Sequence, residues 1–243
     1  MELKIMTYNI HHGKGMDKQI DLHRTAKVIE KSDADIISLN EVDKHYSERN
    51  DYLDQSMWLA QQLNMYHAFS PSLTLTSKQT TTKRQYGNAL LSRFPIVSEK
   101  SYLFNFIPGL IEGRSLLTAT VEHNKKLFDI NVTHLSLNPI LHRKQINFIV
   151  NQLHKNSHPM IIMGDWNMKP GSRGWRKMTT EFHDVWDHAG NGTGFTYPSL
   201  RPKLRLDYLF VSPSFQVVDA EVISNLPHAS DHLPLKATLL FSQ

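Results

Sequence analysis

Short apolar segments bounded by polar or turn-forming residues recur along this sequence and constrain its fold more than any other feature. They are rich in Ile, Val, Leu, Thr and aromatic residues, a pattern typical of β-strands. The segments are residues 3–8, 35–39, 88–92, 115–122, 127–133, 160–163, 207–211 and 236–241. Apolar residues at helical spacing predict helices over 21–31, 54–64 and 138–155. Many strands and few, separated helices favour an α/β or α+β sandwich with the helices outside.

The length and composition of the chain are those of a globular protein that buries a sizeable core. The 243 residues are 40% hydrophobic and contain no internal repeat or Gly/Ser-rich linker, so we expect one domain over 1–243. No apolar run approaches the roughly 18 residues that span a bilayer, and the start lacks a signal-peptide pattern. We therefore expect a cytoplasmic protein, with no obligate protein partner evident. The absence of cysteine excludes disulfides, thiolate metal sites and cysteine nucleophiles.

The charge of the chain is mildly basic. Lys and Arg number 27 against 23 Asp and Glu, which gives a net charge of +4 and suits a phosphate-bearing partner without demanding one. Arg201, Lys203 and Arg205 alternate just before Asp207. They could steer an anion into a cleft or protect an exposed strand edge, and the sequence does not choose between these readings.

Polar side chains stand at the ends of the apolar segments. A buried strand needs no such groups at its tip, whereas a rigid scaffold can gather them from distant positions into one cleft. The stretch GDWN at 164–167 would by itself indicate a turn, but in the company of the other polar residues we favour a site. The set comprises Asn9, Glu41, Asn88, Arg114, His134, Asp165, Asn167, Asp207, Asp231 and His232.

Part of this set suits a hard divalent cation. Glu41, with Asn9 and Asp231, offers the oxygen ligands that Mg²⁺ prefers. Zinc is less attractive, because cysteine is absent and the histidines lack a tight metal-binding spacing such as HExxH. His11 and His12 follow Asn9 closely, and either could contact the substrate, orient the metal ligands or do neither. We carry His12 as a candidate for substrate binding.

Other members of the set suit acid–base catalysis. Asp207 and His232 could form the carboxylate–imidazole pair that orients a catalytic histidine. Asp165 could activate a water molecule while Asn167 positions that water or the phosphate.

The remaining members are candidates for holding the phosphoryl group. Arg114 and His134 are natural clamps for a nonbridging phosphate oxygen, and Asn88 is a further substrate-binding candidate. An Arg after Gly is often simply solvated, and a histidine at a strand end is often a core residue. The complete inventory nonetheless describes metal-assisted hydrolysis of a phosphoester.

The short sequence motifs around these residues resemble those of a known family. The sequence resembles the endonuclease/exonuclease/phosphatase superfamily, which includes deoxyribonuclease I, abasic-site nucleases, inositol polyphosphate 5-phosphatases and neutral sphingomyelinases. The likeness runs from residue 4 to residue 240 and is greatest to compact bacterial metal-dependent hydrolases of that group. The strings occur in the family's order: TYNIHHG, LNEVD, YGNALLSRFPI, EGRSLL, THLSL, GDWNMKP, RLDYLFVS and SDHLPL.

The resemblance implies an α+β fold, a four-layer α/β-β/α sandwich of two packed mixed β-sheets flanked by helices. It implies dependence on Mg²⁺ or Mn²⁺, with Glu41 as the principal ligand and Asn9 and Asp231 nearby. Asn167 and His232 would then contact the scissile phosphate. The roles implied for the other positions are His134 beside the phosphate, Asp207 supporting His232, and Asp165 or a histidine as the base.

Two positions depart from the family's usual strings. Asn40 stands where the family usually has Gln, and Trp166 stands where Phe is commoner. Because Glu41, Asp165 and Asn167 are intact, we expect these departures to affect the surroundings of the site rather than its chemistry.

We therefore expect an enzyme, a metal-dependent phosphoric ester hydrolase. A Mg²⁺-dependent phosphodiesterase acting on nucleic acid is favoured by the basic charge, although no DNA-gripping insertion is evident. The alternative is a hydrolase of small-molecule or lipid phosphoesters, and a remote alternative is a non-catalytic module that binds a phosphate ligand. We expect specificity to reside in loops such as 66–87 and 102–113.

Overall fold

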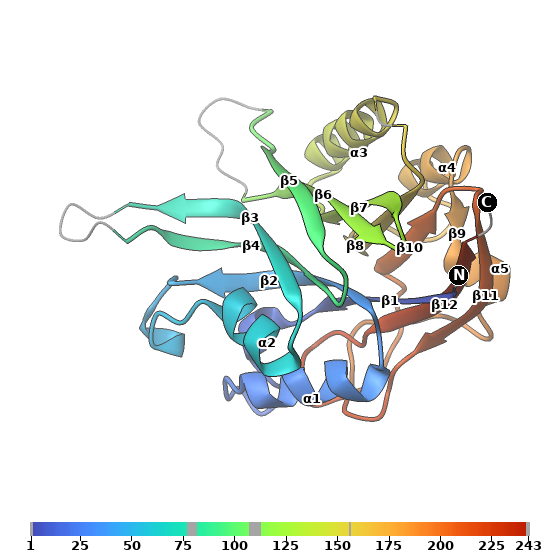
Figure 1. The fold of residues 1–243 in the computed structure, drawn as a ribbon. Helices are drawn as coiled ribbons and strands as arrows, with labels where there is room; N and C mark the ends of the chain where they lie inside the picture. The colour runs from blue at the N-terminus through green and yellow to red at the C-terminus, as the bar shows by residue number, and fades with distance from the viewer. Residues whose placement is uncertain (1, 77–81, 107–112, 156, 242–243) are drawn as a thin grey trace.

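Two β-sheets packed face to face form the centre of the molecule (Figure 1). The computed structural model describes residues 2–76, 82–106, 113–155 and 157–241. Parts of both expected specificity loops, 77–81 and 107–112, lie outside the described residues. Within the described part of the chain, no helix is both long enough and apolar enough to cross a membrane.

The first sheet has six strands in the order β11-β12-β1-β2-β4-β3. Strands β1 and β2 run parallel and the other neighbours antiparallel, so the sheet is mixed. The strands are β1 (Glu2–Asn9), β2 (Ile36–Lys44), β3 (Tyr66–Leu75), β4 (Arg84–Ser92), β11 (Phe215–Val222) and β12 (Leu235–Phe241).

The second sheet also has six strands, in the order β5-β6-β7-β8-β10-β9. It is mixed in the same way, because β7 and β8 run parallel and the other neighbours antiparallel. The strands are β5 (Ile96–Leu103), β6 (Ser115–His123), β7 (Lys126–His134), β8 (Met160–Asp165), β9 (His183–Asp184) and β10 (Asp207–Val211).

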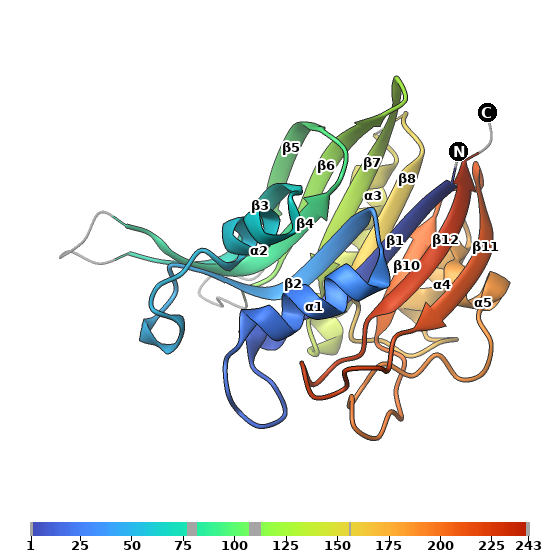
Figure 2. The same cartoon turned by 60° about the horizontal axis from the view of Figure 1, so that its bottom comes forward.

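Helices cover the outer faces of the two sheets (Figure 2). Helices α1 (Leu22–Ser32) and α2 (Gln55–Leu63) cover the first sheet, and α3 (Pro139–Leu153) and α4 (Arg173–Thr179) cover the second. Short helices η1 (His11–Gly13), η2 (Glu48–Asn50) and α5 (Val185–Ala189) complete the described elements.

The apolar residues form one cluster for each contact between layers. The central cluster joins the inner faces of the sheets, where Ile5 and Ile130 are both fully buried. A second cluster packs α1 and α2 on the first sheet and includes Val28 and Leu59. A third, which includes Ile149, packs α3 on the second sheet. These clusters make the predicted four-layer sandwich, and the fold class is confirmed.

The elements predicted from hydrophobic patterns are all present, and four described strands were not predicted: β3, β5, β9 and β11. Strand β5 is mostly exposed and polar along its length, as befits a sheet edge. Strand β3 contains Pro71 at a register shift against β4. The expectation that 66–87 is a loop is therefore wrong, because most of it belongs to the paired strands β3 and β4.

Candidate active site

The parallel strand pairs bring the polar strand ends to one edge of the sandwich. Parallel neighbours end on the same side, and Asn9 at the end of β1 lies beside Asn40 of β2. In the second sheet, Asp165 at the end of β8 lies between His134 of β7 and Asp207 of β10. Residues far apart in the sequence thus form two facing rows.

Asn40 joins the two rows through its carboxamide. Its Nδ2 donates to Asn88 Oδ1 at 2.8 Å and to the carbonyl of Thr133 at 3.0 Å, while its Oδ1 accepts from the backbone N–H of Asp165 at 2.8 Å. Asn88 in turn donates to the carbonyl and the hydroxyl of Ser115. The carboxamide of Asn88 is therefore fully used between the sheets, and the structure disagrees with its expected contact to substrate.

Gly164 allows β8 to approach β7 closely next to the site. Its φ is +145°, and a Cβ at this position would lie 1.8 Å from the carbonyl oxygen of Thr133. Only a residue without a side chain fits there, which explains why the apolar run of β8 ends in Gly before Asp165.

Asp165 is buried at the centre of the site. Its Oδ1 accepts from the backbone N–H of Asn167 at 3.0 Å, and its Oδ2 accepts from Asn9 Nδ2 at 3.1 Å. Burial raises the pKa of Asp165 to about 7, partly offset by the positive charge of His232 and reinforced by the charge of Asp207.

His232, from the segment before β12, is held by Asp207. Its Nδ1 lies 2.8 Å from Asp207 Oδ2, and its Nε2 lies 3.7 Å from Asp165 Oδ2. Burial disfavours the imidazolium, but the charges of Asp207 and Asp165 outweigh it and raise the pKa of His232 to about 10. Among the described residues, Asp207 Oδ1 has no hydrogen-bond partner although it is buried. His232 therefore carries a proton at neutral pH and points its Nε2 edge at Asp165.

Asn167, His134 and Arg114 converge beside this pair. Asn167 Nδ2 donates to His134 Nε2 at 3.2 Å and to the carbonyl of Leu135 at 2.9 Å, and Arg114 Nε donates to the same carbonyl at 3.3 Å. Burial, followed by the positive charges of Arg114 and His232, holds the pKa of His134 well below its usual value. His134 is therefore a neutral imidazole.

Glu41 is connected to this group by Asn9. The residue lies at an irregularity of β2 with φ +60°, and its Oε1 accepts from Asn9 Nδ2 at 3.1 Å. Asn9 Oδ1 accepts from the backbone N–H of His11, so its nitrogen rather than its oxygen faces Glu41. In this orientation Asn9 links Glu41 and Asp165 through its Nδ2, and its role as a metal ligand stays a prediction.

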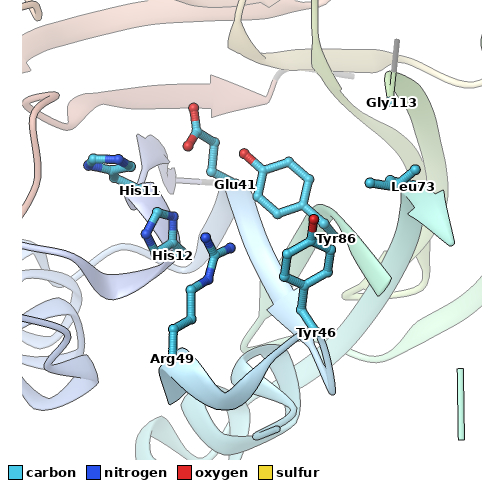
Figure 3. Close-up of a pocket in the computed structure, with 8 residues that line it drawn as sticks. All are labelled: His11, His12, Glu41, Tyr46, Arg49, Leu73, Tyr86 and Gly113. Carbon is cyan, nitrogen blue, oxygen red and sulfur yellow. The ribbon is translucent and has the colours of Figure 1, made fainter. Parts of the chain in front are cut away.

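A cavity of about 280 Å³ opens beside Glu41 (Figure 3). The guanidinium of Arg49 points into it and is held from behind by two hydrogen bonds to Asp43, at 2.8 and 2.7 Å. Burial, together with the charge of Glu41, raises the pKa of the Tyr86 phenol well above its usual value. The residues that line the cavity are His11, His12, Glu41, Tyr46, Arg49, Leu73, Tyr86 and Gly113.

Sequence reasoning missed part of this lining. Tyr46 and Arg49 follow no strand end that the hydrophobic pattern marks, and Tyr86 stands inside the family-like string YGNALLSRFPI without a signal of its own. Only the packing of η2 and β4 around the cavity brings the three together.

Two groups of side chains have donor atoms close enough to hold a metal ion. One is Asp165, Asp207 and His232, and the other is His11, His12 and Glu41, with the donor atoms of each group within 4.8 Å of one another. Their oxygen and imidazole donors fit a divalent cation.

The metal group at Glu41 differs from the one the sequence predicted. The carboxylate of Asp231 is not in this group, and its Oδ1 lies 3.6 Å from Nδ1 of His11. His12 lies in the cavity instead, where burial and then the charge of Arg49 lower its pKa to about 3. The imidazole of His12 is therefore neutral.

Arg205 does not steer anions or protect a strand edge, and both readings of this residue are wrong. Its side chain is only 2% exposed and donates to Asp184 at 2.9 Å and Asp187 at 3.1 Å. Arg201 and Lys203 of the same alternating run are exposed.

Comparisons with known proteins agree with the geometry. The family model described as the Endonuclease/Exonuclease/phosphatase family matches residues 6–232. An endonuclease/exonuclease/phosphatase from Beutenbergia cavernae DSM 12333 superposes with a TM-score of 0.84 at 25% identity, over 99% of this chain and 72% of that one.

Two further solved structures have the same fold. A mannosyl-6-phosphatase from Bacteroides thetaiotaomicron VPI-5482 gives a TM-score of 0.78 at 18% identity, over 98% of this chain and 100% of that one. The human Nocturnin catalytic domain, solved with a bound sulfate anion, gives a TM-score of 0.70 at 20% identity, over 99% of this chain and 94% of that one.

Proposed function

Because this chain belongs to the endonuclease/exonuclease/phosphatase family, whose members are phosphoric ester hydrolases, we propose that it hydrolyses a small phosphoester with the help of a divalent cation. The observation that carries the proposal is the convergence of Asp165, Asn167, His134 and His232 at one edge, with Glu41 and its cavity alongside. Membership in the superfamily was predicted from the sequence and is confirmed.

The protonation states favour Asp165 as the base. His232 is held protonated by Asp207 and His134 is held neutral with a depressed pKa, so neither imidazole is a strong proton acceptor at neutral pH. Asp165, with a pKa near 7, takes a proton from the attacking water as the water oxygen bonds to phosphorus. The leaving oxygen departs with the electrons of the broken P–O bond.

The remaining side chains hold the phosphoryl group. His232 presents a charged N–H at Nε2 that stabilises negative charge on the nonbridging oxygens. Asn167, whose Nδ2 donates to His134 Nε2 and to the carbonyl of Leu135, contributes once it exchanges one of these hydrogen bonds for a phosphate oxygen. Arg114, whose Nε donates to the carbonyl of Leu135, adds a positive charge close to His134.

Glu41 is the residue best placed to hold the cation, Mg²⁺ or Mn²⁺ in this proposal. It is partly exposed and borders the cavity, and no lysine or arginine is paired with its carboxylate among the described residues. The cation supplies Lewis-acid stabilisation of the charge that develops on the phosphoryl and leaving oxygens.

The cavity beside Glu41 favours a small substrate. Its volume of about 280 Å³ holds one small polar group attached to the phosphate. Tyrosine hydroxyls and a guanidinium line it, which suits a leaving group with hydroxyls or charge.

Hydrolysis of bis(4-nitrophenyl) phosphate and 4-nitrophenyl phosphate tests the reaction and separates diesters from monoesters. We expect cation-dependent release of nitrophenol that falls at least about a hundredfold in Glu41→Gln, Asp165→Asn and His232→Asn. His154→Asn, at an exposed position whose imidazole pairs with Glu181, is the matched control. Activity that survives both Glu41→Gln and His232→Asn would refute the site.

A nuclease is the second candidate, favoured by the net charge of +4 and by Arg49, Arg84 and Arg114 around the site. Nicking of supercoiled plasmid, blocked by chelator and by His232→Asn, would establish it. Turnover of the nitrophenyl esters without nicking would leave the small phosphoester as the substrate class.

A further inference from the structure

His11 and His12 lie close to Glu41, and the proposed reaction uses neither of them. A donor atom from each of the three side chains lies within 4.8 Å of the other two, only slightly more than two metal–ligand bonds of about 2.1 Å placed end to end. Figure 3 shows both imidazoles on the same side of the cavity as the Glu41 carboxylate. A small rotation of the side chains would bring all three onto one ion.

The backbone at these three residues adopts a conformation that is uncommon for residues with a side chain. The φ angles are +46° at His11, +47° at His12 and +60° at Glu41. Such outliers cluster at functional sites, where surrounding contacts hold them in place. Here Asn9 Oδ1 accepts from the backbone N–H of His11, and Gln55 Nε2 donates to the carbonyl of His12 at 2.8 Å.

The two imidazoles are available as ligands. In the described part of the chain, neither ring nitrogen of His12 has a hydrogen-bond partner, although the residue is only 8% exposed. Nδ1 of His11 faces the carboxylate of Asp231 at 3.6 Å from its Oδ1, which is longer than a hydrogen bond; a shorter contact there would let Asp231 orient His11 as carboxylates orient metal-binding imidazoles. Asp231 then acts behind a ligand rather than as one.

We propose that His11 and His12 bind the same cation as Glu41, so that this site prefers a first-row transition metal to Mg²⁺. Imidazole nitrogen is a good ligand for Fe²⁺, Ni²⁺ and Zn²⁺ and also binds Mn²⁺, whereas Mg²⁺ takes oxygen ligands almost exclusively. The inference rests on the proposed function only in placing the cation at Glu41.

Pulsed electron paramagnetic resonance of the Mn²⁺-loaded chain tests nitrogen ligation without any turnover. We expect ¹⁴N modulation from directly bound imidazole, reduced in His11→Asn and His12→Asn and lost in the double variant. Asn is the replacement because it tolerates the positive φ of both positions. His154→Asn, far from the cluster in sequence and exposed, should leave the spectrum unchanged.

Calorimetric titration with Mn²⁺ and with Mg²⁺ supplies the second measurement. The double variant should lose about tenfold or more in Mn²⁺ affinity while its Mg²⁺ affinity changes by less than about twofold. Equal losses for the two ions, or wild-type protein without nitrogen modulation, would overturn the inference. If phosphoester hydrolysis in Mg²⁺ still required Glu41 and His232 after such a result, the proposed function would be supported. Only the binding of the cation by His11 and His12 would then be refuted.

Discussion

At the scale of single residues, burial and charge give Asp207 and Asp165 the different roles that the sequence predicts for them. Asp207 is fully buried and hydrogen-bonded to His232, so its negative charge stabilises the imidazolium form of His232. Asp165 is also buried but accepts from neutral donors, and its pKa rises to about 7. Environment thus makes one carboxylate an anchor and the other a proton acceptor.

The first prediction concerns the pH dependence of the rate. Asp165 accepts a proton only as the carboxylate, so kcat/KM should rise with pH through the pKa of this carboxyl, which is about 7 without a cation and which a cation bound at Glu41 would lower. The hydrogen bond from Asn9 stabilises the carboxylate and lowers its pKa, so Asn9→Ala should move this rise to higher pH. The measurement is a pH–rate profile of both proteins. An unchanged midpoint in the variant would argue against Asp165 as the base.

The second prediction concerns the pH dependence of stability. The folded-state pKa of His232 is raised from 6.5 to about 10, so its stabilising contribution is complete below pH 6.5 and is lost as pH rises through 10. In chelator, wild-type protein should lose on the order of a few kcal/mol of unfolding free energy over this window. The Asp207→Asn variant lacks the charge that raises the pKa of His232, so it should lose much less unfolding free energy over the same pH window.

Denaturant unfolding at a series of pH values measures both proteins. Asp219→Asn, at an exposed carboxylate on β11, is the matched control and should follow the wild type. If Asp207→Asn and wild-type protein lost stability in parallel between pH 6.5 and 10, the Asp207–His232 ion pair would not be the cause.

At the scale of elements, the sequence predicts strands well and predicts what happens between them poorly. Alternating or continuous apolar patterns locate β1, β2, β7, β8, β10 and β12, because burial against other layers imposes those patterns. The hydrophobic pattern does not predict β3 or β5. Strand β5 is exposed over much of its length, and β3 contains Pro71. The cross-sheet role of Asn40 and Asn88 depends on sheet packing and leaves no local signal.

The same limit applies to the candidate site. Residues at strand ends could be nominated from sequence, and the structure brings Asp165, Asn167, His134, Asp207 and His232 together. Arg49 and Tyr46 could not, because their approach to Glu41 depends on how the segment around η2 packs. The orientation of the Asn9 carboxamide likewise follows from contacts on both sides of it.

The third prediction tests the contact between β7 and β8. Gly164→Ala would place a methyl group 1.8 Å from the Thr133 carbonyl, so the strands must separate next to Asp165. We expect unfolding free energy to fall by roughly 3 kcal/mol or more. Gly171→Ala, where a Cβ meets no atom within 4 Å and only the positive φ of +74° opposes it, should cost about 1 kcal/mol. Similar losses in the two variants, measured by denaturant unfolding, would show that the close approach is not required.

At the scale of the whole molecule, the residues of the candidate site connect the two sheets at one edge of the sandwich. Asn9 and Glu41 come from the first sheet, while His134 and Asp165 come from the second. Hydrogen bonds from Asn9 to Asp165 and from Asn40 to Thr133 cross between them. A ligand held at this edge therefore acts on the packing of both sheets, and its binding energy is added to the stability of the sandwich.

The fourth prediction follows from that arrangement. Mn²⁺ at about 100 times its dissociation constant should stabilise the folded chain by about 2.7 kcal/mol, or roughly 5–10 °C in Tm for a chain of this size. Glu41→Gln should remove most of the shift, and chelator should reverse it in the wild type. Because we expect one domain over 1–243, calorimetry should give a single transition that moves as a unit. Two transitions, of which only one responds to the cation, would mean that the sheets fold separately and that the edge does not couple them.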